Sequence, residues 1–119
     1  MSHAATVLVV DDDPDTVETM REILQEEGHT VLSASNGREG LQVALQIIPD
    51  LVLLDLEMPV MDGRSFLAEV AKSPTLAGVI VVVLSGTADP GVHCESVKKP
   101  LRLDTLLGLI GRVADAGPA

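Results

Sequence analysis

Acidic, hydroxyl and basic side chains stand in this sequence where aliphatic segments end. In chain order they are Asp11, Asp12, Asp13, Asp55, Ser85, Lys98 and Lys99. Carboxylates that share a pocket repel one another unless a cation lies between them, and carboxylate-rich oxygen sites suit Mg²⁺. A lysine and a serine in the same pocket would neutralise and hydrogen-bond the oxygens of a phosphoryl group. The set therefore indicates phosphoryl transfer to a nucleophilic carboxylate, with metal, hydroxyl and ammonium groups that stabilise the transferred group.

Each of these residues also has a simpler interpretation. Asp12 or Asp13, before Pro14, would be a good helix N-cap, and a serine at the end of a strand is more often a loop hydroxyl. Alternate residues of a strand point to opposite faces, so only one of Lys98 and Lys99 can enter the pocket. Capping explains one acid but not three, which favours metal binding by Asp12.

Aliphatic segments predict the strands that would bring these residues together. Five strands are predicted, at residues 7–10, 30–34, 51–54, 79–84 and 95–98. The first, third and fourth lack polar alternation, which is typical of parallel strands buried on both faces. In a sheet of order 2-1-3-4-5, the first and third strands flank the crevice in which ligands bind. Asp11, Asp12 and Asp55 are therefore expected to converge at the carboxyl ends of the strands.

Amphipathic stripes between these strands predict four helices that face the core. The stripes are Val17, Met20, Ile23 and Leu24; Leu41, Ala44, Leu45 and Ile48; Phe66, Leu67, Val70 and Ala71; and Leu103, Leu106, Leu107, Ile110 and Val113. The alternation implies a flavodoxin-like, doubly wound α/β sandwich with a five-stranded parallel sheet. The connection 86–94 offers nine residues, whereas a crossover that carries a helix needs about 10–12. The helix before the fifth strand is therefore expected to be short or missing.

Four segments carry a family resemblance, in order and over nearly the whole chain. They are VLVVDDDP at 7–14, PDLVLLDLEMPVMDG at 49–63, VVVLSG at 81–86 and KP at 99–100. Together they resemble the receiver domains of bacterial response regulators, of the chemotaxis-regulator type. The resemblance implies that Asp55 accepts a phosphoryl group, that Asp12 binds Mg²⁺ or Mn²⁺ directly, and that Asp11 supports the metal through water.

The same resemblance assigns roles to four further positions. It implies that the backbone carbonyl of Glu57 binds the metal and that Ser85 and Lys99 stabilise the phosphoryl group. The Lys99-Pro100 peptide bond is expected to be cis, as in the family. Glu57 and Thr87 occupy the two variable positions that are expected to tune how quickly water removes the phosphoryl group.

Three features depart from the family pattern. Ser96 stands where the family usually has the aromatic residue whose rotation reports phosphorylation, and Leu101 stands where Phe is frequent. The short connection 86–94 removes much of a helix that belongs to the usual output surface. The acceptor site therefore looks complete, whereas the relay to a partner does not.

Composition narrows the class of protein. The formal net charge of −10 and the pI near 4.4 argue against direct nucleic-acid binding and against adhesion to an anionic membrane. The chain has no apolar stretch of membrane-spanning length, and its single cysteine, Cys94, excludes an internal disulfide, which fits the cytoplasm. We expect one receiver domain over residues 1–119, with its core at about 5–114 and with 115–119 as a tail or the start of a linker.

By this resemblance the protein is expected to act in a two-component phosphorelay and not as a turnover enzyme. A histidine kinase or phosphotransfer protein would phosphorylate Asp55, and the altered surface would bind an unknown downstream protein. A monomer or weak dimer is expected. One alternative is a degenerate receiver that acts as a constitutive protein-interaction module, which Ser96 and the short crossover motivate. Another is an aspartate-nucleophile phosphatase, in which Glu57 would be the second acid.

Overall fold

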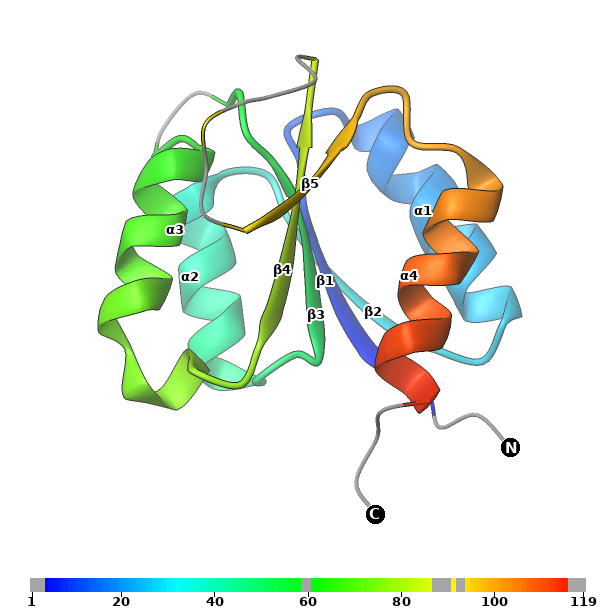
Figure 1. The fold of residues 1–119 in the computed structure, drawn as a ribbon, viewed down its shortest axis with the longest axis horizontal. Helices are drawn as coiled ribbons and strands as arrows, with labels where there is room; N and C mark the ends of the chain where they lie inside the picture. Colours follow the sequence, from blue (N-terminus) through cyan, green and yellow to red (C-terminus); the bar gives the residue numbers. More distant parts are fainter. Residues whose placement is uncertain (1–3, 59–60, 87–90, 92–93, 116–119) are drawn as a thin grey trace.

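Aliphatic segments form the strands and amphipathic segments form the helices of a layered α/β sandwich (Figure 1). The computed structural model describes residues 4–58, 61–86, 91 and 94–115, with side chains as far as residue 113. Its elements are β1 Thr6–Val10, α1 Pro14–Glu26, β2 Thr30–Ala34, α2 Gly37–Gln46, β3 Leu51–Asp55, α3 Gly63–Lys72, the 3₁₀ turn η1 Pro74–Leu76, β4 Ile80–Ser85, β5 Glu95–Lys98 and α4 Leu103–Asp115. The parallel order β2-β1-β3-β4-β5 confirms the predicted flavodoxin-like fold.

Three helices begin at capping side chains. Asp13, Asn36 and Asp62 have extended backbones, and their side-chain oxygens accept hydrogen bonds from backbone N–H groups in the first turns of α1, α2 and α3. These bonds satisfy donors that a helix leaves without an intrahelical partner. Pro14 follows the first cap, at a position where its missing N–H costs nothing. The caps fix where each helix starts, directly after a strand or its loop.

The sheet separates two aliphatic cores. α1 and α4 cover one face, and α2 and α3 cover the other (Figure 1). Alternate residues of each strand enter opposite cores, so Val7 and Val9 of β1 face α1 and α4, whereas Leu8 and Val10 face α2 and α3. Phe66 of α3 is fully buried in the second core. Burial on both faces is what the unbroken aliphatic strands require.

The register between β1 and β3 determines which residues meet at the top of the sheet. Val7 pairs with Leu51 and Val10 with Leu54, so the next residues, Asp11 and Asp55, leave the sheet side by side. Residues 30–34 and 95–98, which the sequence predicted only weakly, form strands with those same bounds. The sheet thus delivers the candidate residues from separate strands to one edge.

Three of the predicted core stripes are partly wrong. Ala71, at the end of the stripe of α3, is exposed. Leu45 of α2 is 48% exposed, and Ile48 is 52% exposed because α2 ends at Gln46 and Ile48 lies beyond the helix. In α4 the buried face runs through Leu106, Leu109, Ile110 and Val113, whereas Leu103 and Leu107 are exposed. Even with these exposed leucines, no helix in the described ranges has the length and hydrophobicity needed to cross a bilayer.

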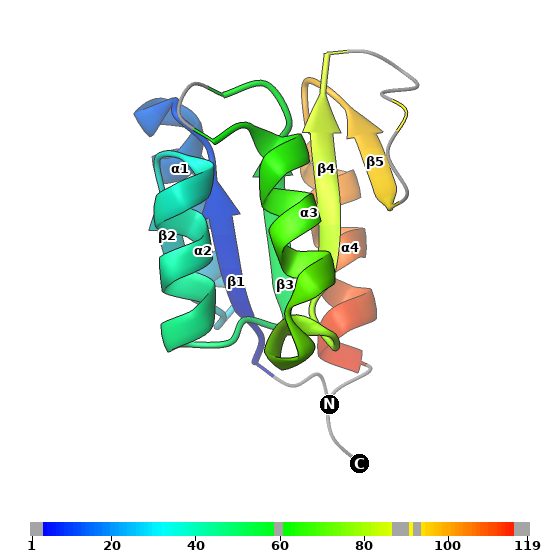
Figure 2. The same ribbon diagram turned by 90° about the vertical axis from the view of Figure 1, so that its left-hand side faces the viewer.

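Among the described residues, no helix lies in the connection between β4 and β5. Gly86, Gly91 and Cys94 are the described residues of this connection and none is helical, whereas Thr87 lies outside the described residues. Ser96 pairs with Val83 and therefore faces the α2–α3 side, where Figure 2 shows no described helix in front of β5. On the other side, Glu95 forms a 2.8 Å ion pair with Arg112 of α4. A polar residue at 96 fits this half-buried position.

Candidate functional site

Three polar side chains are buried at the carboxyl ends of the strands. Asp11 follows β1, Asp55 ends β3 and Ser85 ends β4, with 6%, 3% and 1% of their surfaces exposed. Within the part of the chain whose side chains are described, no other polar or charged residue is buried to that degree. Burying ionisable groups is unfavourable unless they are paired or bind an ion, so this concentration indicates a functional site.

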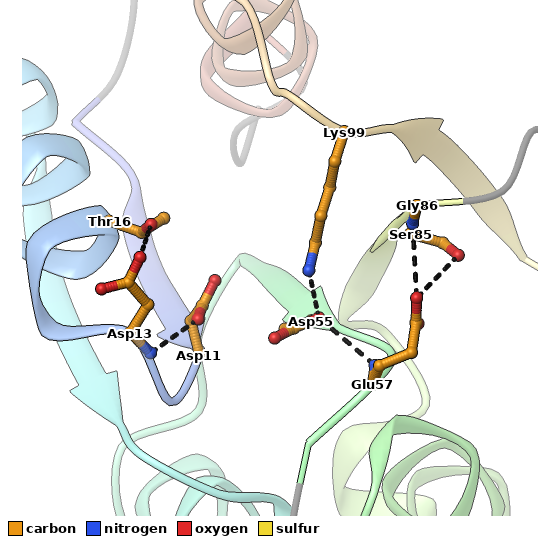
Figure 3. A network of polar contacts seen from close by, with 8 residues as sticks. All are labelled: Asp11, Asp13, Thr16, Asp55, Glu57, Ser85, Gly86 and Lys99. Atoms are coloured by element: carbon orange, nitrogen blue, oxygen red, sulfur yellow. Dashed lines mark hydrogen bonds and ion pairs between the residues drawn. The ribbon is translucent and has the colours of Figure 1, made fainter.

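Lys99 is the lysine that reaches this site. Its Nζ donates to Oδ1 of Asp55 at 2.6 Å, and Figure 3 shows its side chain extended toward that carboxylate. The backbone N–H of Lys99 donates to the carbonyl of Ser85 at 2.7 Å, which holds the loop after β5 against β4. The Lys99-Pro100 peptide bond is cis. Lys98 is exposed, in agreement with the expectation that only one of the two lysines enters the pocket.

The three consecutive acids after β1 have different tasks. Asp13 caps α1, where its carboxylate accepts hydrogen bonds from the backbone N–H of Asp15 at 3.1 Å and from the hydroxyl of Thr16 at 2.7 Å. Asp11 turns back into the site and accepts the backbone N–H of Asp13 at 2.9 Å (Figure 3). Asp12 lies between them with its side chain exposed. The capping interpretation thus applies to Asp13, which leaves Asp11 and Asp12 for the pocket.

The charges of the site perturb one another. Burial, followed by the neighbouring negative charges of Asp55 and Asp12, raises the pKa of Asp11, although the hydrogen bond from Asp13 and the charge of Lys99 oppose this. Burial alone would lower the pKa of Lys99, but the hydrogen bond and charge of Asp55 and the charge of Asp11 outweigh it and raise that pKa. The site therefore favours additional positive charge.

The acidic cluster suits a divalent cation. Asp11, Asp12 and Asp55 each offer a carboxylate oxygen, and these oxygens lie within 4.8 Å of one another. Ligand oxygens on an octahedral Mg²⁺, with bonds of about 2.1 Å, stand about 3–4.2 Å apart, so only a small contraction is needed. The pKa of Asp11, raised by burial and then by the charges of Asp55 and Asp12, gives the same answer, because a bound cation would stabilise the ionised carboxylate. The residues present fit Mg²⁺.

Glu57 makes a contact that sequence reasoning did not foresee. Its Oε1 accepts hydrogen bonds from the Ser85 hydroxyl and from the backbone N–H of Gly86, both at 3.3 Å. Its own backbone N–H donates to Oδ1 of Asp55 at 3.2 Å. Figure 3 shows the carboxylate reaching from the end of β3 to the end of β4. The pairing of β3 with β4 brings the two strand ends together, but no signal in the sequence shows which way the Glu57 side chain points.

A groove with a volume of about 970 Å³ extends from the acids along α1. The acidic end includes Asp11, Asp12, Asp55 and Glu57. The apolar walls are Met20, Ile23, Leu84, Pro100, Leu101, Leu103 and Leu106. Leu101, where the family often has Phe, thus lines the groove. The helical periodicity of α4 predicts only that its leucines face the core and gives no sign of this apolar extension of the groove.

Comparisons with known proteins agree with this geometry. Residues 7–107 match the family model of the response regulator receiver domain. The chain is 33% identical over 81 residues to protein PilH of Pseudomonas aeruginosa, covering 68% of this chain and 67% of PilH. It is 39% identical over 113 residues to the transcriptional regulatory protein GlrR of Escherichia coli, covering 89% of this chain but 26% of GlrR. The chain therefore spans about a quarter of the length of that relative.

A solved response regulator structure is also similar to this chain in fold and sequence. Response regulator protein TrrA from Thermotoga maritima, determined in complex with Mg²⁺–BeF, has a TM-score of 0.79 and 31% identity to this chain. The match covers 91% of this chain and 97% of TrrA. The similarity thus extends over most of both chains.

Proposed function

The chain belongs to the response regulator receiver domain family, and from that premise we propose that it accepts a phosphoryl group on Asp55 in an Mg²⁺-dependent reaction. The donor is a histidine kinase or a phosphotransfer protein, and the phosphorylated form binds a downstream protein in the cytoplasm. The domain works as a monomer or weak dimer and does not turn over substrate as an enzyme. The observation that carries this proposal is Asp55 itself, 3% exposed, bonded to Lys99 and beside Asp11 and Asp12.

Each residue of the site has a task in this reaction. A carboxylate oxygen of Asp55 attacks the phosphorus, and the bond from phosphorus to the donor atom breaks, with its electron pair leaving on the donor. Asp12 and the backbone carbonyl of Glu57 would hold Mg²⁺, Asp11 would support it through water, and the bound ion would neutralise charge on the phosphoryl group. Lys99 exchanges its contact with Asp55 for a phosphoryl oxygen.

The Ser85 hydroxyl donates a hydrogen bond to another phosphoryl oxygen. Positioning and charge stabilisation are the contributions that phosphoryl transfer requires from a protein. Ser85 is 1% exposed and ends the strand next to β3, which supports this role. A phosphoryl group brings about −1.5 to −2 charge at neutral pH, which favours its pairing with the Lys99 ammonium already at the site.

The test uses a small phosphodonor. The protein is incubated with acetyl phosphate in MgCl₂ or in EDTA, and its intact mass is measured for the wild type and for Asp55→Asn. Asp104→Asn is the matched control, because Asp104 is an exposed acid of α4 outside the groove. One acid-labile phosphoryl adduct is expected in MgCl₂ for the wild type and Asp104→Asn only. An adduct that persists in Asp55→Asn contradicts the proposal, and sustained release of phosphate from a phosphomonoester indicates the phosphatase.

A constitutive interaction module is the second candidate, and Ser96 favours it. This residue replaces the usual reporting aromatic and lies half-buried on β5, where no described helix covers it. A module that no longer switches would bind Mg²⁺–beryllofluoride, if at all, with NMR shifts confined to the acidic site. Shifts that reach β5 and α4 in the wild type support the switching receiver instead.

A further inference from the structure

The carboxylate of Glu57 occupies two hydrogen-bond donors at the end of β4. The Ser85 hydroxyl and the Gly86 backbone N–H both donate to Glu57 Oε1 at 3.3 Å. These two donors come from consecutive residues and point to one oxygen, as Figure 3 shows. Two converging donors beside a lysine and a candidate metal site form a place for an anionic oxygen.

The same place is where the proposed function puts a phosphoryl oxygen. Glu57 is linked to the phosphoacceptor through its backbone N–H, which donates to Asp55 Oδ1 at 3.2 Å. Its side chain therefore starts at the acceptor and ends at the Ser85 donor, along the path that a phosphoryl group on Asp55 would take. Two anions cannot hold this position together, because they would repel each other and share the same donors.

We propose that Glu57 is a tethered anion that competes with the phosphoryl group for the donors of Ser85 and Gly86, and so sets how tightly the site holds that group. The inference rests on the proposed function, in which Ser85 binds a phosphoryl oxygen. Glu57 is a positioning residue, because it acts through Ser85 and Gly86 and not on the reacting atoms. When a phosphoryl group arrives, the Glu57 side chain rotates into water.

Displacement of Glu57 is feasible because its side chain is exposed. A group in contact with water regains hydration when it leaves its partners, so the exchange costs only part of each bond. Both bonds are long at 3.3 Å, which keeps them at the weak end of charge-assisted hydrogen bonds. Removing this competitor is therefore expected to tighten anion binding about tenfold.

The experiment measures binding of beryllofluoride, a phosphoryl mimic, at saturating Mg²⁺ for the wild type, Glu57→Ala and Glu57→Gln. Asp15→Asn is the matched control, because Asp15 also lines the groove and its replacement removes one negative charge there. The backbone N–H resonance of Gly86, measured in EDTA without beryllofluoride, reports the contact itself. Circular dichroism checks that each variant is folded.

Three results are expected. The Gly86 resonance moves in Glu57→Ala but not in Asp15→Asn. Glu57→Ala binds beryllofluoride about tenfold more tightly than the wild type, and Asp15→Asn binds it as the wild type does. Glu57→Gln lies between Glu57→Ala and the wild type, because its amide oxygen remains an acceptor without the charge.

Other patterns overturn the inference. If Glu57→Ala binds no more tightly than the wild type, Glu57 does not compete. If Glu57→Gln equals Glu57→Ala, charge repulsion alone accounts for the gain and occupation of the donors is refuted. If neither the wild type nor any Glu57 variant binds beryllofluoride through Asp55, the proposed function fails as well. Binding by the wild type without a gain in Glu57→Ala refutes only the inference.

Discussion

Replacement of Asp11 by Asn is expected to stabilise the metal-free protein. The Asp11, Asp12 and Asp55 carboxylate oxygens lie within 4.8 Å of one another, and two like charges at that distance repel by about 3.5 kcal/mol at an effective dielectric constant of about 20. The positive charge of Lys99 cancels part of this repulsion. Asn keeps an oxygen that can accept the 2.9 Å hydrogen bond from the backbone of Asp13. We therefore expect a gain of about 1–3 kcal/mol in the free energy of unfolding.

The assay is urea unfolding followed by far-ultraviolet circular dichroism, because the chain has no Trp or Tyr for fluorescence. In EDTA, Asp11→Asn unfolds at higher urea than the wild type. In MgCl₂ at 100 times the dissociation constant, the wild type gains about 2.7 kcal/mol by mass action. Asp11→Asn gains less because it has lost a ligand, so the difference narrows or reverses. Asp15→Asn, an exposed acid on α1, serves as the control for the same chemical change.

Acidification gives a second check on Asp11. Its pKa is raised in the folded protein, so the folded state binds a proton at a pH where the unfolded chain does not. As the pH falls through that raised value, wild-type Asp11 becomes neutral and the wild type approaches Asp11→Asn in stability. The reasoning is refuted if Asp11→Asn is less stable than the wild type in EDTA at neutral pH. It is also refuted if both proteins gain equally from Mg²⁺.

Other changes test the elements that support the site. Hydrogen bonds from the backbone and side chain of Ser65 lower the pKa of Asp62 below its ordinary value of 3.8. The cap therefore stabilises the fold fully at pH values above 3.8, and this stabilisation is lost as the pH falls through the lowered pKa. Asp62→Ala is thus expected to lower the melting temperature at neutral pH, with a difference that shrinks in acid. Phe66→Ala, which empties a site with 0% exposure, is expected to cost about 3–5 kcal/mol in urea unfolding; a cost below about 1 kcal/mol would contradict this packing. In Gly63→Ala the new Cβ would lie 2.7 Å from the Leu56 Cα and 3.0 Å from the Asp55 carbonyl oxygen, so the backbone at the phosphoacceptor must shift. Acetyl phosphate should therefore label the Gly63→Ala protein more slowly than the Gly78→Ala control, in which nothing lies within 4 Å of the new Cβ. Equal labelling rates would show that the loop after β3 tolerates the shift.

Much of the fold could be predicted because each strand is a local sequence signal. Residues 30–34 and 95–98 lie in weak patterns, yet their places between helices left one consistent sheet order. The acids could be placed because the carboxyl ends of parallel strands meet at one edge. Periodicity was less reliable for helix faces, since it cannot show where a helix ends. Ile48 shows this, because it continues the stripe of α2 but lies beyond Gln46.

Contacts between side chains from different strands could not be predicted from local pattern. The side chain of Glu57 can point toward water or toward Ser85, and only the packed structure shows that it points toward Ser85. The choice between Asp12 and Asp13 as the helix cap likewise depends on the backbone after β1, which aims Asp13 at the first turn of α1. The sequence shows that Ser96 replaces the usual reporting aromatic residue, but it does not show which side of β5 this residue faces. In the structure Glu95 pairs with Arg112 on the α4 side, so Ser96 faces the other side, where no described helix covers β5.

The site joins residues that are far apart in the sequence, and this has a consequence for folding. The Lys99–Asp55 contact spans 44 positions and the Ser85–Glu57 contact spans 28. No local unit of the chain contains the whole site, so the site forms only when β1, β3, β4 and β5 have paired in the sheet. Contacts of this kind form late and slow the search for the native state. Because Asp11 follows β1 and Asp55 ends β3, an ion bound by these acids would bridge the two strands. Amide hydrogen exchange throughout the central sheet should therefore slow when the ion binds.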